Sequence, residues 1–149
     1  MLKKKTNSIA TNRRAGYDYK IGDKFEAGIV LKGSEVKSLR NNRVDISHAF
    51  ISQENGEIFL KNSSIPQYLA SGVLNHEVTR SRKLLFKKKE IKRMLGNINK
   101  KGTSLVPLRI YFSSKGYAKL LIAIGEGKKK YDKRQIKKEK QLKRQKKLI

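Results

Sequence analysis

The sequence predicts a mainly β fold, an OB-like closed antiparallel β-barrel with a few flanking α-helices and a basic C-terminal tail. At least five short segments alternate apolar and polar residues, whereas only two show a helical period. Short, tight turns separate neighbouring strands. The chain has 149 residues, which suits one domain and a tail. A closed barrel is the simplest way to remove sheet edges in a small β protein.

The first strand is predicted at residues 25–31. Phe25 and Ala27 lie on one side of an extended chain, and Glu26 lies on the other. The apolar side should face the core, so Glu26 should point outward.

A short helix is predicted next, at residues 33–40. Ser34 is a residue type that caps helix N-termini, and Val36 and Leu39 form an apolar pair at i, i+3 spacing.

A hairpin should follow the helix. Residues 46–52 and 57–60 have strand character, and Asn55-Gly56 between them favours a tight turn with positive φ. Residues 62–82 show no regular period and are expected to be irregular.

A longer helix is predicted over residues 84–98. Leu84, Ile91 and Ile98 recur seven residues apart, with Lys and Arg between them. Gly96 and Gly102 should mark its end.

Two more strands are predicted, at residues 108–112 and 118–124, joined by a tight turn at residues 113–116. In the second of them Leu120 and Ile122 should face the core, so Lys119 should point outward.

Charge is the strongest indication of a partner. The chain has 37 Lys and Arg against 12 Asp and Glu, a net charge of +25. Residues 125–149 hold twelve basic and three acidic residues, or +9, so residues 1–124 still carry +16. We expect a basic arm (residues 1–15), a barrel domain (16–125) and a tail (126–149) that is disordered on its own. Nucleic acid is the expected partner, ahead of an anionic membrane.

The sequence argues against catalysis, metal binding and a membrane span. There are no cysteines, which excludes disulfides and thiolate sites and suits a cytoplasmic protein. His48 and His76 lie far apart in the sequence without the neighbours of a catalytic or metal site. No apolar run is long enough to be a signal peptide core or to span a bilayer. We expect no catalytic residues, no metal and no cofactor.

Two residue types point to RNA contacts. Tyr131 lies within the basic tail with few apolar neighbours, and its ring can stack on an unpaired base. Glu26 would repel phosphate, but its carboxylate can accept hydrogen bonds from base amino or imino groups or from ribose hydroxyls.

Several blocks of the sequence resemble the SmpB (SsrA-binding protein, small protein B) family. They cover nearly the whole chain in the family's order. They are NRRA (12–15), FEAGI (25–29), GSEVKSLR (33–40), NH (75–76), RSRKLL (80–85), VPL (106–108) and GKKKYDKR (127–134). The chain departs from the family at Tyr17, where His is frequent, and at Val78, where Pro is common.

The resemblance implies an OB-like barrel that binds the tRNA-like domain of transfer-messenger RNA (tmRNA) and carries it to stalled bacterial ribosomes. The tail would then become helical in the decoding centre of the small subunit and in the empty mRNA channel. It also implies a monomer that meets elongation factor Tu through alanyl-tmRNA.

The resemblance further assigns site residues. For tmRNA they are Asn12, Glu26, Leu85 and Lys119. For the decoding centre they are Gly127, Lys128, Lys129, Tyr131, Asp132, Lys133 and Arg134. Gly127 is expected to let the chain bend away from the barrel, and Asp132 to cap the helix beyond it.

Two other functions fit the composition. A ribosomal protein or general RNA chaperone would bind structured RNAs with little preference and with a steep dependence on salt. A peripheral membrane protein would use the tail as a basic amphipathic helix, but the few apolar residues of the tail make a poor membrane face.

Overall fold

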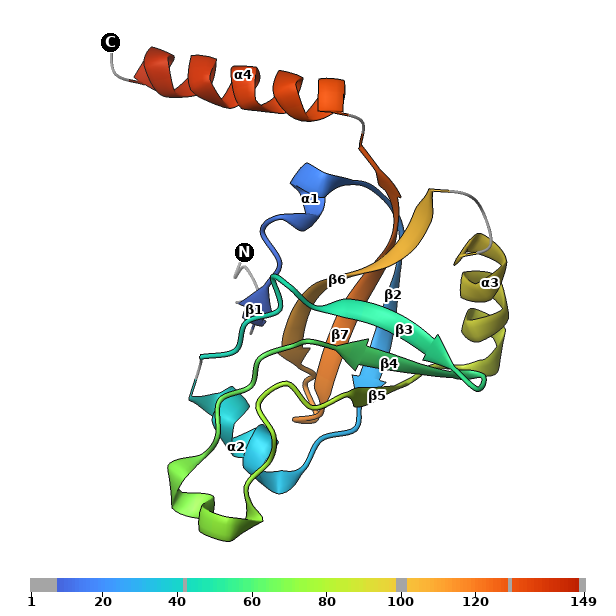
Figure 1. Cartoon of the computed structure of the whole chain (residues 1–149), viewed down its shortest axis with the longest axis vertical. Helices are drawn as coiled ribbons and strands as arrows, with labels where there is room; N and C mark the ends of the chain where they lie inside the picture. Colours follow the sequence, from blue (N-terminus) through green and yellow to red (C-terminus); the bar gives the residue numbers. More distant parts are fainter. Residues whose placement is uncertain (1–7, 42, 99–101, 129, 148–149) are drawn as a thin grey trace.

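Within the part of the chain that the structure describes, seven strands form one antiparallel sheet, accompanied by four α-helices, of which α4 extends away from the body (Figure 1). The computed structural model describes residues 8–41, 43–98, 102–128 and 130–147. In chain order the elements are β1 (Ser8–Thr11), α1 (Ala15–Asp18), β2 (Tyr19–Ile29), α2 (Gly33–Arg40), β3 (Phe50–Glu54), β4 (Glu57–Lys61), the 3-10 segment η1 (Leu69–Leu74), β5 (Arg82–Leu85), α3 (Lys88–Ile98), β6 (Thr103–Phe112), β7 (Ala118–Gly127) and α4 (Lys130–Lys147).

The sheet is curled, but its hydrogen-bonded ladder stays open. The strand order is β1-β6-β7-β2-β5-β4-β3, so β1 and β3 are the two edges. The β3–β4 hairpin crosses over the β6–β7 layer in Figure 1, and β3 lies near β6 across a gap of about 120 Å³. The mainly β, antiparallel prediction is confirmed. Closure of the barrel is not confirmed by the strand pairs of the described residues.

The predicted helix at residues 33–40 is confirmed by α2, but the predicted cap is wrong. Lys32 is the N-cap residue, and its backbone N–H donates to Glu35 Oε1 at 2.8 Å. Ser34 lies inside the first turn and is buried, and its hydroxyl is 2.8 Å from Nδ1 of His76. A tertiary partner therefore takes the side chain that was expected to cap the helix.

The turn of the predicted hairpin is confirmed. Asn55 and Gly56 have φ of 51° and 79°, as a two-residue turn of this sequence requires. The first strand begins later than expected, at Phe50. Ile46 is buried without belonging to a strand, so its apolar character reflected the core rather than a β ladder.

The helix predicted at residues 84–98 is wrong at its start. Leu84 belongs to β5, where it pairs with Ile58 of β4 and Ile29 of β2. The helix itself is α3, which begins at Lys88 and continues through Gly96 to Ile98, so the prediction that Gly96 marks its end is wrong. Leu84 fitted the seven-residue spacing, yet its alternation with exposed Leu85 is that of a strand.

Strands β2, β6 and β7 are all longer than predicted, and β1 lies within the segment expected to be an arm. The three long strands pack closely at Gly125. A Cβ there would lie 2.8 Å from Cγ2 of Val106 and 3.0 Å from Cβ of Tyr19. Because Gly125 has no side chain, the strands can stay paired at this point, and β7 continues to Gly127. The alternation of larger side chains ends before Gly125, so it did not predict this extension.

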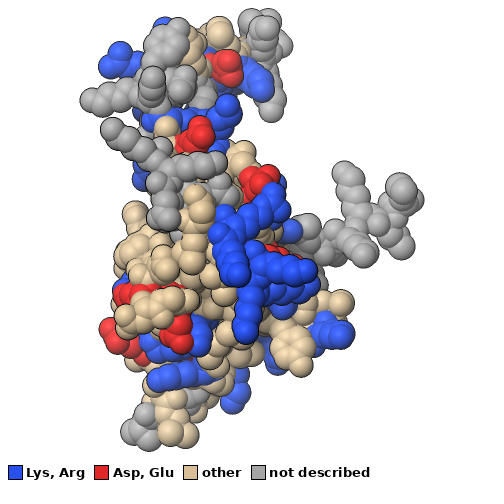
Figure 2. Space-filling view, turned by 90° about the vertical axis from the view of Figure 1, so that its right-hand side faces the viewer, with Lys and Arg blue, Asp and Glu red and all other residues tan. Residues whose placement is uncertain are grey.

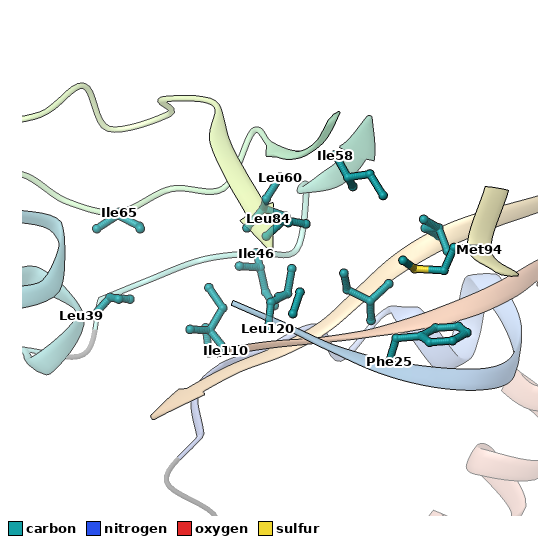
Figure 3. Close-up of a cluster of buried hydrophobic side chains, with 14 residues drawn as sticks. Phe25, Leu39, Ile46, Ile58, Leu60, Ile65, Leu84, Met94, Ile110 and Leu120 are labelled. Atoms are coloured by element: carbon teal, nitrogen blue, oxygen red, sulfur yellow. The ribbon is translucent and has the colours of Figure 1, made fainter. Parts of the chain in front are cut away.

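One hydrophobic core lies inside the curled sheet (Figure 3). Phe25, Ile110 and Leu120 come from the long strands, and Met94 of α3 packs against the same cluster. Leu39 of α2 extends the core toward the connection between β4 and β5. Burial of these side chains is the main favourable term for the fold.

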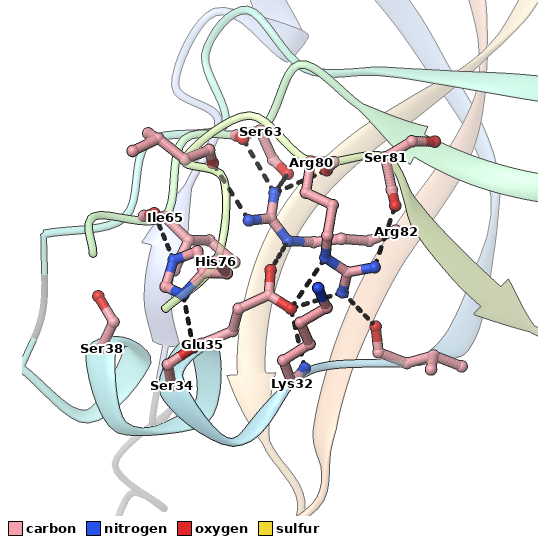
Figure 4. Close-up of polar contacts among 12 residues, drawn as sticks. Lys32, Ser34, Glu35, Ser38, Ser63, Ile65, His76, Arg80, Ser81 and Arg82 are labelled. Atoms are coloured by element: carbon pink, nitrogen blue, oxygen red, sulfur yellow. Dashed lines mark hydrogen bonds and ion pairs between the residues drawn. The ribbon is translucent and has the colours of Figure 1, made fainter. Parts of the chain in front are cut away.

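A buried ion pair joins α2 to β5 (Figure 4). Arg82 and Glu35 are both fully buried, and Arg82 Nε donates to Glu35 Oε2. The remaining donors of Arg82 reach the backbone and hydroxyl of Ser63 and the carbonyls of Val78 and Arg80, at 2.8–3.1 Å. Each of the three guanidinium nitrogens therefore has an acceptor, as a buried guanidinium requires.

Glu35 is held in its charged form. Burial raises the pKa of Glu35, but hydrogen bonds from Arg80, the Lys32 backbone and Arg82 outweigh it and leave the pKa below the ordinary 4.5. Arg80 Nη2 donates to Glu35 Oε1 at 2.5 Å. One carboxylate thus binds two guanidinium groups and a helix N-terminus.

His76 fixes the same connection from the other side. Its Nδ1 is 2.8 Å from Ser34 Oγ, and its Nε2 is 2.9 Å from the carbonyl oxygen of Ile65. The prediction that residues 62–82 are irregular holds except for η1 and the first residue of β5. Side-chain hydrogen bonds take the place of a ladder in this segment.

Replacing Glu35 with Gln should lower the free energy of unfolding by roughly 3–5 kcal/mol, because it leaves Arg82 buried without a countercharge. Urea denaturation at pH 7 measures the loss. A matched control, Glu54→Gln, removes an exposed partner of Lys61 and should cost less than about 1 kcal/mol.

The pH dependence gives a second measure. The folded pKa of Glu35 is lowered, so its contribution is complete above the unfolded value of 4.5 and is lost as the pH falls through the folded value. The stability gap between the parent and Glu35→Gln should therefore narrow below pH 4.5. A gap that stays constant down to acid unfolding would contradict the pairing.

Candidate RNA interface

The strand register brings three of the predicted RNA-facing residues together on the outside of the sheet. Gly28 of β2 pairs with Leu85 of β5 on one side and with Lys119 of β7 on the other. Glu26 lies two residues before Gly28, so its side chain is on the same face. We call this surface, Glu26, Leu85 and Lys119 around Gly28, the Glu26 face.

These side chains differ in chemistry. Glu26 is exposed, Leu85 has 53% of its surface exposed, and Lys119 is half-buried. Gly28 between them is half-buried, and a Cβ there would lie 3.5 Å from Cβ of Leu85. The face therefore offers a hydrogen-bond acceptor, an apolar contact and a cation within a few residues, which suits the mixed surface of a folded RNA better than a run of phosphates.

Two further residues belong to this face. Tyr111 of β6 pairs with Lys119, and its hydroxyl donates to Glu26 Oε2. The guanidinium of Arg109 lies 4.9 Å from the centre of the Tyr111 ring. Arg109 and Tyr111 were not predicted to contact RNA, although they alternate with buried Ile110 just as Glu26 alternates with buried Phe25. The same alternation could have found them.

The contact changes the acidity of Tyr111. Its partial burial raises the pKa, the hydrogen bond to Glu26 and the nearby negative charge raise it further, and Arg109 opposes them; the result is a pKa of about 12. Tyr111 is therefore a donor at neutral pH and orients the carboxylate. Of the two carboxylate oxygens of Glu26, Oε2 is bonded to Tyr111 and Oε1 has no hydrogen-bond partner among the described residues. Oε1 therefore remains an exposed acceptor.

Asn12 lies elsewhere, just beyond β1. Its side-chain amide donates to the carbonyl oxygen of Pro107 at 3.0 Å, and its backbone N–H donates to that of Leu108 at 2.7 Å. Its side chain holds the N-terminal segment against β6. The structure thus brings together three of the four residues predicted for tmRNA and leaves Asn12 apart from them.

The tail begins where β7 ends and leaves the body at the end distant from α2 (Figure 1). Gly127 has ordinary backbone dihedrals and room for a side chain, so the bend there does not require glycine. Lys128 is tied to the body: its backbone N–H donates to Asp18 O at 3.0 Å and its ammonium to Gly16 O at 2.7 Å. Lys137 of α4 lies 5.8 Å from the centre of the Tyr17 ring.

The other predicted tail residues belong to α4 or lie outside the residues that the structure describes. Arg134 is exposed on α4. The backbone of Tyr131, Asp132 and Lys133 is helical, and Lys129 lies outside the described residues. Because α4 begins at Lys130, Asp132 lies within its first turn, and the prediction that it caps the helix is wrong.

The described part of the chain contains no cluster of three acidic or histidine residues that could bind a metal ion. His76 is buried and its two ring nitrogens are bonded to Ser34 and Ile65. Within the same residues, none of the helices has the length and apolarity that a bilayer crossing needs.

Three comparisons relate the chain to known proteins. The family model "SmpB protein" matches residues 9–149. An SsrA-binding protein of Sinorhizobium fredii (strain NBRC 101917 / NGR234) is 50% identical over 138 residues, which are 93% of this chain and 87% of that protein. The SsrA-binding protein of Rhizobium meliloti (strain 1021) is 49% identical over the same length and the same shares.

A solved structure is also similar. It is described as "tmRNA-SmpB: a journey to the center of the bacterial ribosome", and one of its chains is 48% identical with a TM-score of 0.67. The match covers 80% of this chain and 84% of that one.

The Tyr111–Glu26 contact predicts an altered titration. Glu26→Gln should lower the pKa of Tyr111 from about 12 toward the ordinary 10.0, because the neutral amide no longer repels the phenolate. Carbon-13 NMR of the tyrosine ring carbons, assigned through Tyr111→Phe, measures this pKa. The control Glu57→Gln, which removes a carboxylate paired with Lys83, should leave it unchanged. A Tyr111 pKa near 10.0 in the parent would contradict the contact.

Proposed function

The chain belongs to the SmpB family, and from this we propose that it is an RNA-binding adaptor of trans-translation. It binds the tRNA-like domain of tmRNA and delivers that RNA to stalled bacterial ribosomes. The observation that carries the proposal is the Glu26 face. Three residues from three different strands, which the family resemblance assigns to RNA contact, adjoin one glycine.

The Glu26 face recognises the RNA at short range. Glu26 accepts hydrogen bonds from base or ribose donors, because its acceptor Oε1 is exposed while Tyr111 holds Oε2. Lys119 binds a phosphate and Leu85 packs against a ribose or base. Arg109, stacked on Tyr111, adds a second cation beside the carboxylate. Asn12 acts indirectly in this proposal, by holding the N-terminal segment beside the face.

The tail acts at a second place. Residues 126–149 enter the decoding centre and the empty mRNA channel, with Gly127, Lys128, Lys129, Tyr131, Asp132, Lys133 and Arg134 as the contact residues. Lys119 and Gly127 are the second and last residues of β7, which separates the two sites by roughly 25 Å at the rise of a strand. One rigid strand therefore links RNA recognition to the tail.

The conformation of the tail depends on its partner. Residues 130–147 form a strongly basic helix with few apolar residues. An isolated helix with many like charges is only marginally stable in water. We propose that the tail is disordered in the free protein and becomes the helix on the ribosome, where rRNA phosphates neutralise its lysines. mRNA in the channel would exclude it by volume and by charge.

Further parts of the proposal concern the assembly. The protein acts as a cytoplasmic monomer, makes and breaks no bonds, and needs no cofactor. It meets elongation factor Tu through alanyl-tmRNA. The curled sheet serves as an OB-like barrel, with β3 facing β6 across the gap between them.

Truncation after Lys128 should separate the two activities. This variant keeps β7 and the bonds from Lys128 to α1, so the body should stay folded and bind the tRNA-like domain within about threefold of the parent. Tagging of nascent chains on stalled ribosomes should be abolished. Gel shifts and an in vitro tagging assay measure the two. Equal loss of both, in a variant with an unchanged melting temperature, would contradict the division of labour.

Glu26→Ala should weaken binding of the tRNA-like domain about tenfold, the effect of losing one charge-assisted hydrogen bond. Removal of a merely repulsive charge would strengthen binding instead. The matched control is Glu54→Ala, which removes the same charge from the tip of the β3–β4 hairpin and should leave affinity unchanged or slightly higher.

Competition with bulk tRNA at about 0.2 M salt separates this function from a general RNA chaperone, which would show no preference.

A further inference from the structure

One side of α3 carries a dense group of unpaired positive charges. Residues 87–93 read KKKEIKR, and Lys87, Lys88, Lys89 and Lys92 are all exposed. Figure 2 views the molecule from the side on which α3 lies in Figure 1, and it shows Lys and Arg side chains gathered into one patch there. We call these four lysines the α3 basic surface. The Glu26 face and the tail do not include any of them.

The helix is firmly oriented, so these lysines point in a fixed direction. Met94 is fully buried, and Ile91 packs against the core. Arg93 Nη2 donates to Asp23 Oδ2 at 2.8 Å, and its guanidinium lies 5.8 Å from the centre of the Phe25 ring. At 100° per residue, Lys88, Lys89 and Lys92 lie on the side of the helix opposite Met94.

The arrangement works against the stability of the free protein. Lys88 and Lys92 are four residues apart and Lys89 and Lys92 three apart, so their like charges repel on one face of the helix. Three lysines also lie at or just before the first turn, where the helix dipole disfavours cations. A face that only had to be solvated would do better with mixed charges.

Glu90 in the first turn is the one acidic residue of α3 and offsets only part of this charge. Acidic residues on the neighbouring strands are already paired. Asp23 is paired with Arg93, and Glu57 with Lys83. Among the described residues no ion pair involves Lys87, Lys88, Lys89 or Lys92. A polyanion would supply the missing countercharge.

We propose that the α3 basic surface binds the phosphate backbone of a double-helical stem in the tRNA-like domain of tmRNA. The inference rests on the proposed function and extends its RNA footprint. Lysines act as point charges and suit phosphates rather than base edges. The sequence of α3 contains no aromatic residue, so bases have nothing to stack on there, which favours a paired stem over a single strand.

The α3 basic surface is joined to the Glu26 face through β2. Asp23, which holds Arg93, lies three residues before Glu26 on that strand, and exposed Lys24 lies between them. An RNA seated on Glu26 therefore reaches α3 by continuing past Lys24. The α3 basic surface binds the stem through its charge, whereas the Glu26 face binds the RNA through hydrogen bonds.

The test compares two triple variants of equal net charge. In one, Lys88, Lys89 and Lys92 are changed to Gln; in the other, the exposed and scattered Lys20, Lys32 and Lys115 are changed to Gln. Affinity for a transcript of the tRNA-like domain is measured between about 0.05 and 0.3 M salt. Loss of three phosphate contacts should reduce the slope of log K against log salt by about 2 in the first variant, and by less than about 0.5 in the second.

The first variant should also melt no lower than the parent, since it removes repulsion within α3. Equal slopes for the two variants, or an unchanged slope in the first, would overturn the α3 proposal, even if binding to ribosomes fell. Failure of the proposed function looks different: the parent itself would then show no preference for the tRNA-like domain over bulk tRNA.

Discussion

Arg82 and Glu35 are 47 positions apart in the chain and fully buried against each other, joining α2 to β5. Such a pair is tolerated only when the remaining donors and acceptors are also satisfied. Here Arg80, Ser63 and the backbone of the intervening connection supply the partners, and no buried side-chain polar atom of the described residues lacks one. Because β5 ends at Leu85, the pair also sets the position of Leu85 in the Glu26 face.

The Glu26 face shows how a strongly basic protein can hold one useful carboxylate. The net charge of +25 attracts RNA over long distances but does not distinguish one RNA from another. Glu26 offers a short-range acceptor, and Tyr111 keeps it in place by donating to one of its oxygens. In the proposed function, long-range attraction and discrimination between RNAs are therefore carried by different residues.

The three basic regions of the molecule, which are Lys119, the α3 lysines and the tail, differ in how firmly the fold holds them. Lys119 lies on a central strand, and the α3 lysines lie on a helix anchored by Met94 and Arg93. The tail contacts the body through Lys128 at its base and through Lys137, whose ammonium lies over the Tyr17 ring. Rigid cations suit a folded RNA of fixed shape, since little entropy is lost on binding. A segment that has to enter a channel benefits from ordering only on arrival.

The sequence by itself determined the features that depend on local periodicity. Alternation predicted that Glu26 points outward, the Asn-Gly pair predicted the turn at residues 55–56, and the bounds of α2 follow from its own pattern. Family motifs then indicated RNA binding. Only the tertiary structure decided that Leu84 is a strand residue, that Ser34 bonds His76 rather than capping α2, and that β1 and β3 remain edges. It also decided that Tyr111 joins Glu26. Each of these depends on a partner distant in sequence, and no local pattern encodes which distant residue will be the neighbour.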